Sequence, residues 1–132
     1  MYIIYILFPY IWYSTHMKIG VPKEIKNNEF RVSLTPHSVK SLTSNSHDVF
    51  VQSGAGASIG FDDNQYIEAG AIILDAAEDV YKSSTLIVKV KEPMPSEFIY
   101  LNKSHTLFTY LHLAGDPSQA AALIATGVTG IA

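Results

Sequence analysis

Short apolar runs alternate with polar, helix-prone segments along most of this chain. The apolar runs predict strands over residues 18–22, 48–52, 71–74, 86–90, 106–110 and 128–132. Helical segments are expected to begin at Thr35-Pro36, Asp62, Ala76, Pro95 and Asp116, and Gly70 and Gly127 are expected to follow two helix ends. Strands separated by helices imply right-handed crossovers and parallel pairing. We therefore predict an α/β fold, a mostly parallel open sheet with helices on both faces, of the Rossmann-like or flavodoxin-like kind.

The first residues do not share this pattern. Residues 1–13 are almost wholly apolar and aromatic and carry no charge. They are too few for a transmembrane helix, which needs roughly 20 residues, and they lack the basic region and cleavage site of a signal peptide. We interpret residues 1–16 as an upstream leader and residues 17–132 as the domain, with no membrane association. An extra strand or helix lying on the surface stays open for the leader.

Composition narrows the function classes. The chain has 132 residues, of which 48% are hydrophobic, which suits one domain with its own core. Its net charge is −3, and the 9 Lys and Arg residues are scattered, so no nucleic-acid surface is indicated. The absence of cysteine excludes disulfides and thiolate chemistry, and the histidines have no metal-binding spacing.

One strand carries charges where a core strand normally has none. Residues 86–90 form an apolar run that includes Lys89, and Lys91 follows directly before Glu92-Pro93. Burying a lysine is costly unless an anionic group faces it. The carboxyl ends of parallel strands are also where open α/β sheets bind ligands, so this stretch predicts a site.

Two further ionisable residues are expected at the same edge. Arg31 lies in the loop after the first predicted strand, and His112 follows the fifth. Arginine binds a carboxylate through two hydrogen bonds, lysine polarises a carbonyl, and histidine exchanges protons near neutral pH. Together with Lys91 they describe a pocket for a small 2-oxo or 2-amino acid.

Ordinary structural roles are open for the same residues. Arg31 could cap a helix or form a salt bridge with Glu29, Lys91 could be solvated and paired with Glu92, and His112 could be satisfied in the core. The glycines of residues 54–60 follow a strand, but the third comes one position too late for a dinucleotide-binding G-x-G-x-x-G turn. We interpret that segment as a tight structural turn.

Several of these segments also resemble one enzyme family. Residues 17–32 (MKIGVPKEIKNNEFRV), 54–56, 88–93, 107–114 and 127–132 are similar to the L-alanine dehydrogenases, and the resemblance runs from Met17 to Ala132. The N-terminal domain of proton-translocating transhydrogenase shares the opening but lacks equivalents of the 91–93 and 111–113 segments. The resemblance therefore favours alanine dehydrogenase.

The resemblance implies reversible NAD-dependent oxidative deamination of L-alanine to pyruvate and ammonium. Arg31 would hold the substrate carboxylate, Lys91 would bind substrate and polarise its carbonyl or imine, and His112 would be the general acid/base. The family's catalytic aspartate and NAD site are expected in a second domain beyond Ala132, so that residues 17–132 form an incomplete N-terminal domain that is inactive alone. A cytoplasmic homo-oligomer, in this family a hexamer, is also implied.

Two other interpretations of the chain remain. One is an inactive fragment of a truncated gene, and the other is a nucleotide-binding module like that of transhydrogenase. The sequence also departs from the family at Ser46, where a glycine usually ends a helix. We expect Asn45 to adopt the left-handed conformation there instead.

Overall fold

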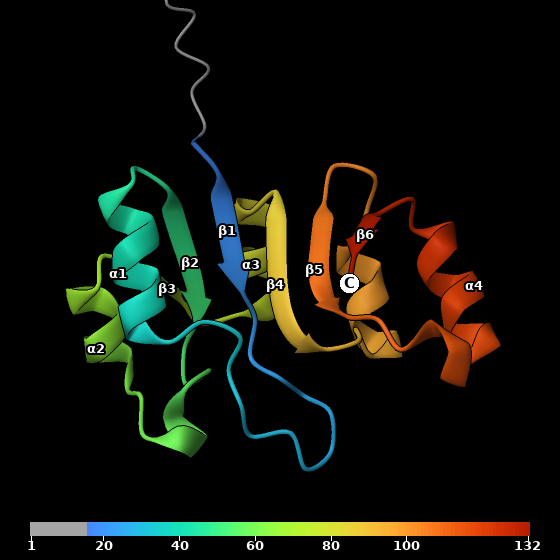
Figure 1. The fold of residues 1–132 in the computed structure, drawn as a ribbon, viewed down its shortest axis with the longest axis horizontal. Coiled ribbons are helices and arrows are strands. Elements are labelled where there is room, and N and C mark those ends of the chain that lie inside the picture. Colours follow the sequence, from blue (N-terminus) through green and yellow to red (C-terminus); the bar gives the residue numbers. More distant parts are fainter. Residues whose placement is uncertain (1–15) are drawn as a thin grey trace, which may run out of the picture.

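Strands and helices alternate from His16 to Ala132, the part of the chain that the computed structural model describes (Figure 1). The strands are β1 (Lys18–Val21), β2 (Asp48–Gln52), β3 (Ile72–Leu74), β4 (Leu86–Lys91), β5 (Thr106–Tyr110) and β6 (Thr129–Ile131). The helices are α1 (Pro36–Ser44), α2 (Asp63–Glu68), α3 (Ala77–Ser83) and α4 (Pro117–Ala125), with 3₁₀ turns η1 (Ala57–Ile59), η2 (Pro95–Tyr100) and η3 (Leu113–Gly115). The interpretation of the leader falls on residues outside the described range, except for His16, whose Nε2 lies 3.0 Å from the Asp48 carboxylate.

All strands join one parallel sheet, as the alternating pattern predicts. Their order is β3-β2-β1-β4-β5-β6. This order is that of the Rossmann fold, so the sheet is of the Rossmann-like and not the flavodoxin-like kind. The chain leaves β1 toward β2 on one side and later returns to β4 on the other, which makes the β1–β4 junction the switch point of the sheet. Ligands of such folds bind in the crevice outside the strand ends at that point.

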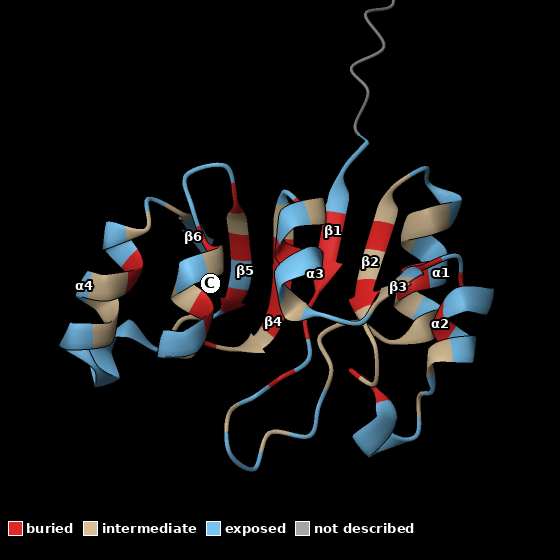
Figure 2. Ribbon diagram, turned by 180° about the vertical axis from the view of Figure 1, so that it is seen from behind, coloured by how far each residue is buried: buried red, intermediate tan, exposed pale blue. Residues whose placement is uncertain are grey.

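Helices cover both faces of the sheet, which confirms the predicted architecture (Figures 1 and 2). Val39 of α1 and Tyr66 of α2 share one buried cluster with inward residues of β1 and β2. Tyr81 of α3 and Leu123 of α4 share a second cluster. Strand β4 contributes Val88 to the first and Ile87 to the second, as the alternation of side chains along a strand requires.

The helix ends follow the local signals in the sequence. The Thr35 hydroxyl accepts a hydrogen bond from the Ser38 amide at 3.2 Å, with Pro36 in the first helical position. Asp62 forms a capping box with Gln65 at the start of α2, and Gly70 after that helix has φ +93°. Asp116 caps α4 through the amides of residues 118 and 119. These side chains satisfy amides that the first turn of a helix leaves without partners.

The expectation for Asn45 is wrong. Asn45 has φ −98° and lies at the end of α1, while Ser46 has φ +66°. The His47 amide donates to the Leu42 carbonyl at 3.2 Å, and the Ser46 amide donates to Thr43 at 3.1 Å. This Schellman pattern requires the left-handed conformation one residue after the cap, and that residue is Ser46.

Gly20 brings β1 against the end of α3, and we predict that Gly20→Ala destabilises the domain. A Cβ at position 20 would lie 2.5 Å from Ser84 Oγ and 2.9 Å from Ser84 Cβ. Overpacking of this kind costs about 1–3 kcal/mol, measurable by urea denaturation. Ser84→Gly removes both clashing atoms, so the double variant should lose less stability than the two single variants summed. Strictly additive losses would contradict the contact.

Candidate functional site

The carboxyl ends of β1, β4 and β5 bring the predicted site residues to one edge of the sheet. Arg31 lies in the loop between β1 and α1, Lys91 is the last residue of β4, and His112 follows β5. The ladder between β1 and β4 has only the pairs Ile19–Leu86 and Gly20–Ile87, so the two strands separate beyond it. The loop after β1 and the end of β4 therefore form the two sides of the switch-point crevice.

Arg31 forms a two-pronged ion pair with Glu29. Its Nε and Nη2 donate to the two carboxylate oxygens at 2.8 and 2.7 Å, and its own amide donates at 2.9 Å. The Arg31 side chain is 61% exposed, whereas that of Glu29 is 6% exposed. Arg31 thus forms the salt bridge with Glu29 that was one of its possible structural roles. It uses only part of the guanidinium, and the remaining N–H groups can donate to a second carboxylate.

The ion pair with Arg31 lowers the pKa of Glu29. The hydrogen bond from the Arg31 side chain lowers the pKa of Glu29 to about 2, and the charge of Lys91 acts in the same direction. Lys91 therefore lies close enough for its charge to be felt at the Arg31–Glu29 pair.

Lys91 follows an irregularity in β4. Val88 pairs with Phe108 and Lys91 with Tyr110, so β4 has one more residue than β5 over this interval. Such a bulge changes the alternation of side chains and re-aims the residue that follows. The Lys91 carbonyl accepts a hydrogen bond from Thr109 Oγ1 at 2.8 Å, which holds the strand end on β5.

The alternative in which Lys91 pairs with Glu92 is wrong. Glu92 is buried and forms an ion pair with Lys26 of the loop after β1. Burial opposes ionisation of Glu92, but the hydrogen bond and charge of Lys26, together with the charge of Lys91, outweigh it and lower its pKa. The pair ties the Arg31 loop to the residue directly after Lys91.

His112 is exposed, so its interpretation as a satisfied core histidine is wrong. It begins η3 with φ +51°, and its carbonyl accepts a hydrogen bond from the Gly115 amide at 3.1 Å. A Cβ at position 115 would lie 2.9 Å from His112 Cδ2 and Nε2. Gly115 therefore lets the turn close beneath the imidazole, which remains accessible for proton exchange.

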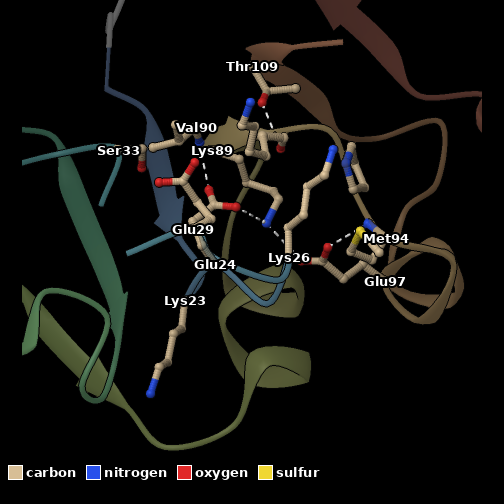
Figure 3. A network of polar contacts seen from close by, with 12 residues as sticks. Lys23, Glu24, Lys26, Glu29, Ser33, Lys89, Val90, Met94, Glu97 and Thr109 are labelled. Carbon is tan, nitrogen blue, oxygen red and sulfur yellow. Dashed lines mark hydrogen bonds and ion pairs between the residues drawn. The ribbon is translucent and has the colours of Figure 1, made fainter. Parts of the chain in front are cut away.

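A buried charge cluster surrounds Lys89 of β4, two residues before Lys91 (Figure 3). Lys89 Nζ lies 3.2 Å from Glu24 Oε2 and 3.0 Å from Glu97 Oε1, and the three side chains are 1%, 3% and 4% exposed. The second Glu24 oxygen accepts the Val90 amide at 2.6 Å. The Tyr81 hydroxyl also donates to Glu97, and its burial and the Glu97 charge raise the pKa of Tyr81. A buried lysine in this strand requires an anionic partner, and Lys89 has two, Glu24 and Glu97.

A cavity of about 390 Å³ lies beside the Arg31 loop. Its wall includes Arg31, Val88, Val90 and the exposed rings of Phe108 and Tyr110. Neither Lys91 nor His112 is among its lining residues. Arg31 is thus the candidate residue that faces this largely apolar space, while the other two lie along the same edge.

The glycine turn of residues 54–60 does not have the form of a phosphate-binding loop. The Gly54 amide donates to Asp63 Oδ1 at 2.8 Å, and Ser53 Oγ donates to the other oxygen at 2.7 Å. The Gly54 amide and the Ser53 hydroxyl are thus already used by a carboxylate of the chain itself. The turn η1 also separates the glycines from the start of α2, so these residues do not fit a dinucleotide.

Sequence reasoning missed most of the buried cluster. Lys89 was visible as a charge inside an apolar strand, and that signal indicated an anionic partner. Glu24 and Glu97 are polar residues in loop and 3₁₀ segments, where carboxylates are ordinary. Nothing in their spacing marks them as the two partners of one lysine.

The described part of the chain has neither a metal-binding group of side chains nor a helix that could span a membrane. Among residues 16–132, no group of His, Asp or Glu side chains could hold a metal ion. Within the same range, none of the helices has the length and apolar character needed to cross a membrane. The strand order instead defines a doubly wound α/β domain, with the cationic side chains of Arg31 and Lys91 at its switch-point edge.

Comparison with known proteins places this domain in a family. Residues 20–132 match the family model described as the alanine dehydrogenase/PNT N-terminal domain. Alanine dehydrogenases of Bacillus subtilis and Methanococcus maripaludis are 53% and 47% identical over 116 residues, which are 88% of this chain. The chain belongs to the alanine dehydrogenase/PNT N-terminal domain family.

Solved structures agree with this assignment. An L-alanine dehydrogenase superposes with a TM-score of 0.85 at 48% identity, covering 88% of this chain and 32% of that one. A transhydrogenase from Sinorhizobium meliloti superposes with a TM-score of 0.80 at 29% identity, covering 87% and 34%. The chain spans about 30% of the length of the curated alanine dehydrogenases that it matches.

We predict that Glu29 stays ionised far into the acid range because of Arg31. Its folded pKa of about 2 lies below the ordinary value, so the pair contributes stability above about pH 4.3 that is lost as the pH falls toward 2. Carboxyl NMR titration should show a mostly ionised Glu29 at about pH 3.5. In Arg31→Gln the midpoint should rise toward the ordinary value. An unchanged midpoint would contradict the pairing.

Proposed function

We propose that this chain is the substrate-binding part of an NAD-dependent alanine dehydrogenase, which interconverts L-alanine with pyruvate and ammonium. The observation that carries the proposal is the placement of Arg31, Lys91 and His112 at one sheet edge in a chain of this family. The high identity to alanine dehydrogenases supports it further. An enzyme of this kind would act in the cytoplasm as a homo-oligomer, with hexamers as the family's form.

Each residue has a role that its chemistry supports. Arg31 binds the substrate carboxylate with the guanidinium N–H groups that Glu29 does not use. Lys91 donates a hydrogen bond to the 2-oxo oxygen or the imine nitrogen and stabilises negative charge there. His112 removes a proton from the water that adds to the imine carbon and returns a proton to the departing amine.

The nicotinamide nucleotide supplies hydride exchange at the same substrate carbon. Because the glycine turn of this chain is closed by Asp63, we assign nucleotide binding to a part of the complete enzyme other than residues 17–132. The present residues then bind and orient the carboxylic acid and move its protons. A transhydrogenase-like module would instead bind nucleotide without turning over alanine.

We test the function in a hybrid enzyme, in which residues 17–132 replace the matching segment of B. subtilis alanine dehydrogenase. NADH absorbance should fall only when both pyruvate and ammonium are present, with the unaltered B. subtilis enzyme as control. A hybrid that melts as cooperatively as the control but does not oxidise NADH would overturn the proposal.

In the hybrid, His112→Ala should lower kcat by about 10²–10⁴-fold, the usual loss for a general acid/base. His37→Ala serves as the matched control because His37 is an exposed histidine on α1. An unchanged kcat in the His112 variant would remove His112 from the proton-transfer step.

Arg31→Ala should raise the pyruvate KM by about 10-fold or more, since hydrogen bonds to a charged group contribute about 1.5–3 kcal/mol. Lys40→Ala, at an exposed position of α1, is the control for loss of a cation. Equal effects of the two substitutions on KM would contradict a specific carboxylate site.

The 132-residue chain alone should not oxidise NADH with pyruvate and ammonium present. Hydride transfer requires a bound dinucleotide held about 3–3.5 Å from the substrate carbon, and residues 1–132 contain no G-x-G-x-x-G sequence. Steady NADH oxidation by the purified chain would refute this assignment.

A further inference from the structure

Lys89 is buried at a place where burial is hard to explain by stability alone. Its ammonium lies between Glu24 and Glu97 with almost no exposed surface. Removing three charged groups from water is costly, and well-packed apolar residues often stabilise a fold equally well. Neither Lys89 nor its partners take part in the proposed chemistry. A buried ion cluster of this kind is better accounted for by the geometry that it imposes.

The cluster joins the segments after β1 and in β4 at the point where the ladder between these strands ends. Beyond Gly20–Ile87, β1 and β4 share no further ladder pair, and the Val90 amide is left without a strand partner on that side. Glu24 accepts this amide and simultaneously contacts Lys89. One carboxylate thus continues the link between β1 and β4 past the point where the strands diverge.

Glu97 extends the link to the segment that follows β4. Its Oε1 accepts from Lys89 and from the Tyr81 hydroxyl of α3, both at 3.0 Å. Its Oε2 accepts the Met94 amide at 2.8 Å at the start of η2. The ammonium therefore connects the loop after β1 with the segment that follows β4.

These contacts control where the proposed substrate-binding residues lie. The loop that carries Arg31 is fixed to β4 at both ends, through Glu24 on the Val90 amide at 2.6 Å and Ser33 Oγ on the Val88 carbonyl at 2.7 Å. Lys89 and Val90 occupy the interval in which β4 has its extra residue, directly before Lys91. The cluster thus holds both the Arg31 loop and the bulge that aims Lys91.

We propose that Lys89, through its ion pairs with Glu24 and Glu97, is a positioning residue that sets the distance between Arg31 and Lys91 for the carboxylate substrate. This inference rests on the proposed function for its substrate. It goes further by assigning the geometry of the site to a residue whose ammonium group is held by two buried carboxylates.

The kinetic test uses Lys89→Met in the hybrid enzyme. The pyruvate KM should rise about 10-fold or more because the two cationic groups lose their fixed spacing. The kcat should fall by less than about threefold, since His112 is on another strand end, and the KM for NADH should stay within about twofold. Lys82→Met removes an exposed lysine that also pairs with a glutamate and should change none of these values.

A charge-balanced variant separates positioning from stability. Lys89→Met leaves an additional uncompensated negative charge in the cluster, whereas Lys89→Met/Glu97→Gln restores the original net charge. The double variant should regain most of the lost melting temperature but keep the raised pyruvate KM. Recovery of both would show that Lys89 only offsets charge and would overturn the proposal, as would a normal KM in the single variant.

Hydrogen exchange on the 132-residue chain tests the geometry independently of catalysis. Lys89→Met should accelerate exchange of the Val90 amide and of the loop over residues 23–33 by about 10-fold or more, while β2 amides keep their protection. Lys89→Arg keeps the charge and should show an intermediate effect even if Lys89→Met fails to fold. Unchanged loop protection in a folded variant would overturn the positioning role, whereas an inactive hybrid would overturn only the proposed function.

Discussion

The structure around the site depends on one buried ammonium group, that of Lys89, held between the carboxylates of Glu24 and Glu97. In water these charges would each be hydrated, and within the fold they replace that hydration by each other and by backbone amides. Such an arrangement tolerates little displacement, because any lengthening leaves a charge buried and unpaired. The cluster therefore specifies how the loop after β1, the end of β4 and the start of η2 meet.

The position of the cluster follows from the topology of the sheet. In a Rossmann strand order the connections that follow the parallel neighbours β1 and β4 lead to opposite sides of the sheet, and the ladder between these two strands stops early. The backbone groups exposed by this divergence need partners, and Glu24 supplies one. The same divergence opens the crevice in which Arg31 and Lys91 lie. The early end of the β1–β4 ladder thus both leaves backbone groups that need partners and opens the crevice to a ligand.

Charge is distributed unevenly across this edge. The charges cancel within the Arg31–Glu29 pair and within the Lys26–Glu92 pair. Lys91 has no ion-pair partner among the described residues. Lys91 therefore offers a positive charge that no ion pair uses, and the carboxylic acid proposed as substrate would use it. The glycine turn after β2 has the opposite character, because Asp63 fills it with negative charge.

Local sequence was sufficient for the strand positions, the capping residues Thr35, Asp62 and Asp116, and the parallel α/β class, because these depend on periodicity and on short-range hydrogen bonds. It also placed Arg31 in the loop after β1, and Lys91 and His112 at the ends of β4 and β5. Only the tertiary structure decided that Lys89 pairs with Glu24 and Glu97, which are 65 and 8 residues away along the chain. The tertiary structure likewise decided that Lys26 forms an ion pair with Glu92. Pairing between distant charges depends on which segments the fold brings together, and no spacing along the chain encodes that.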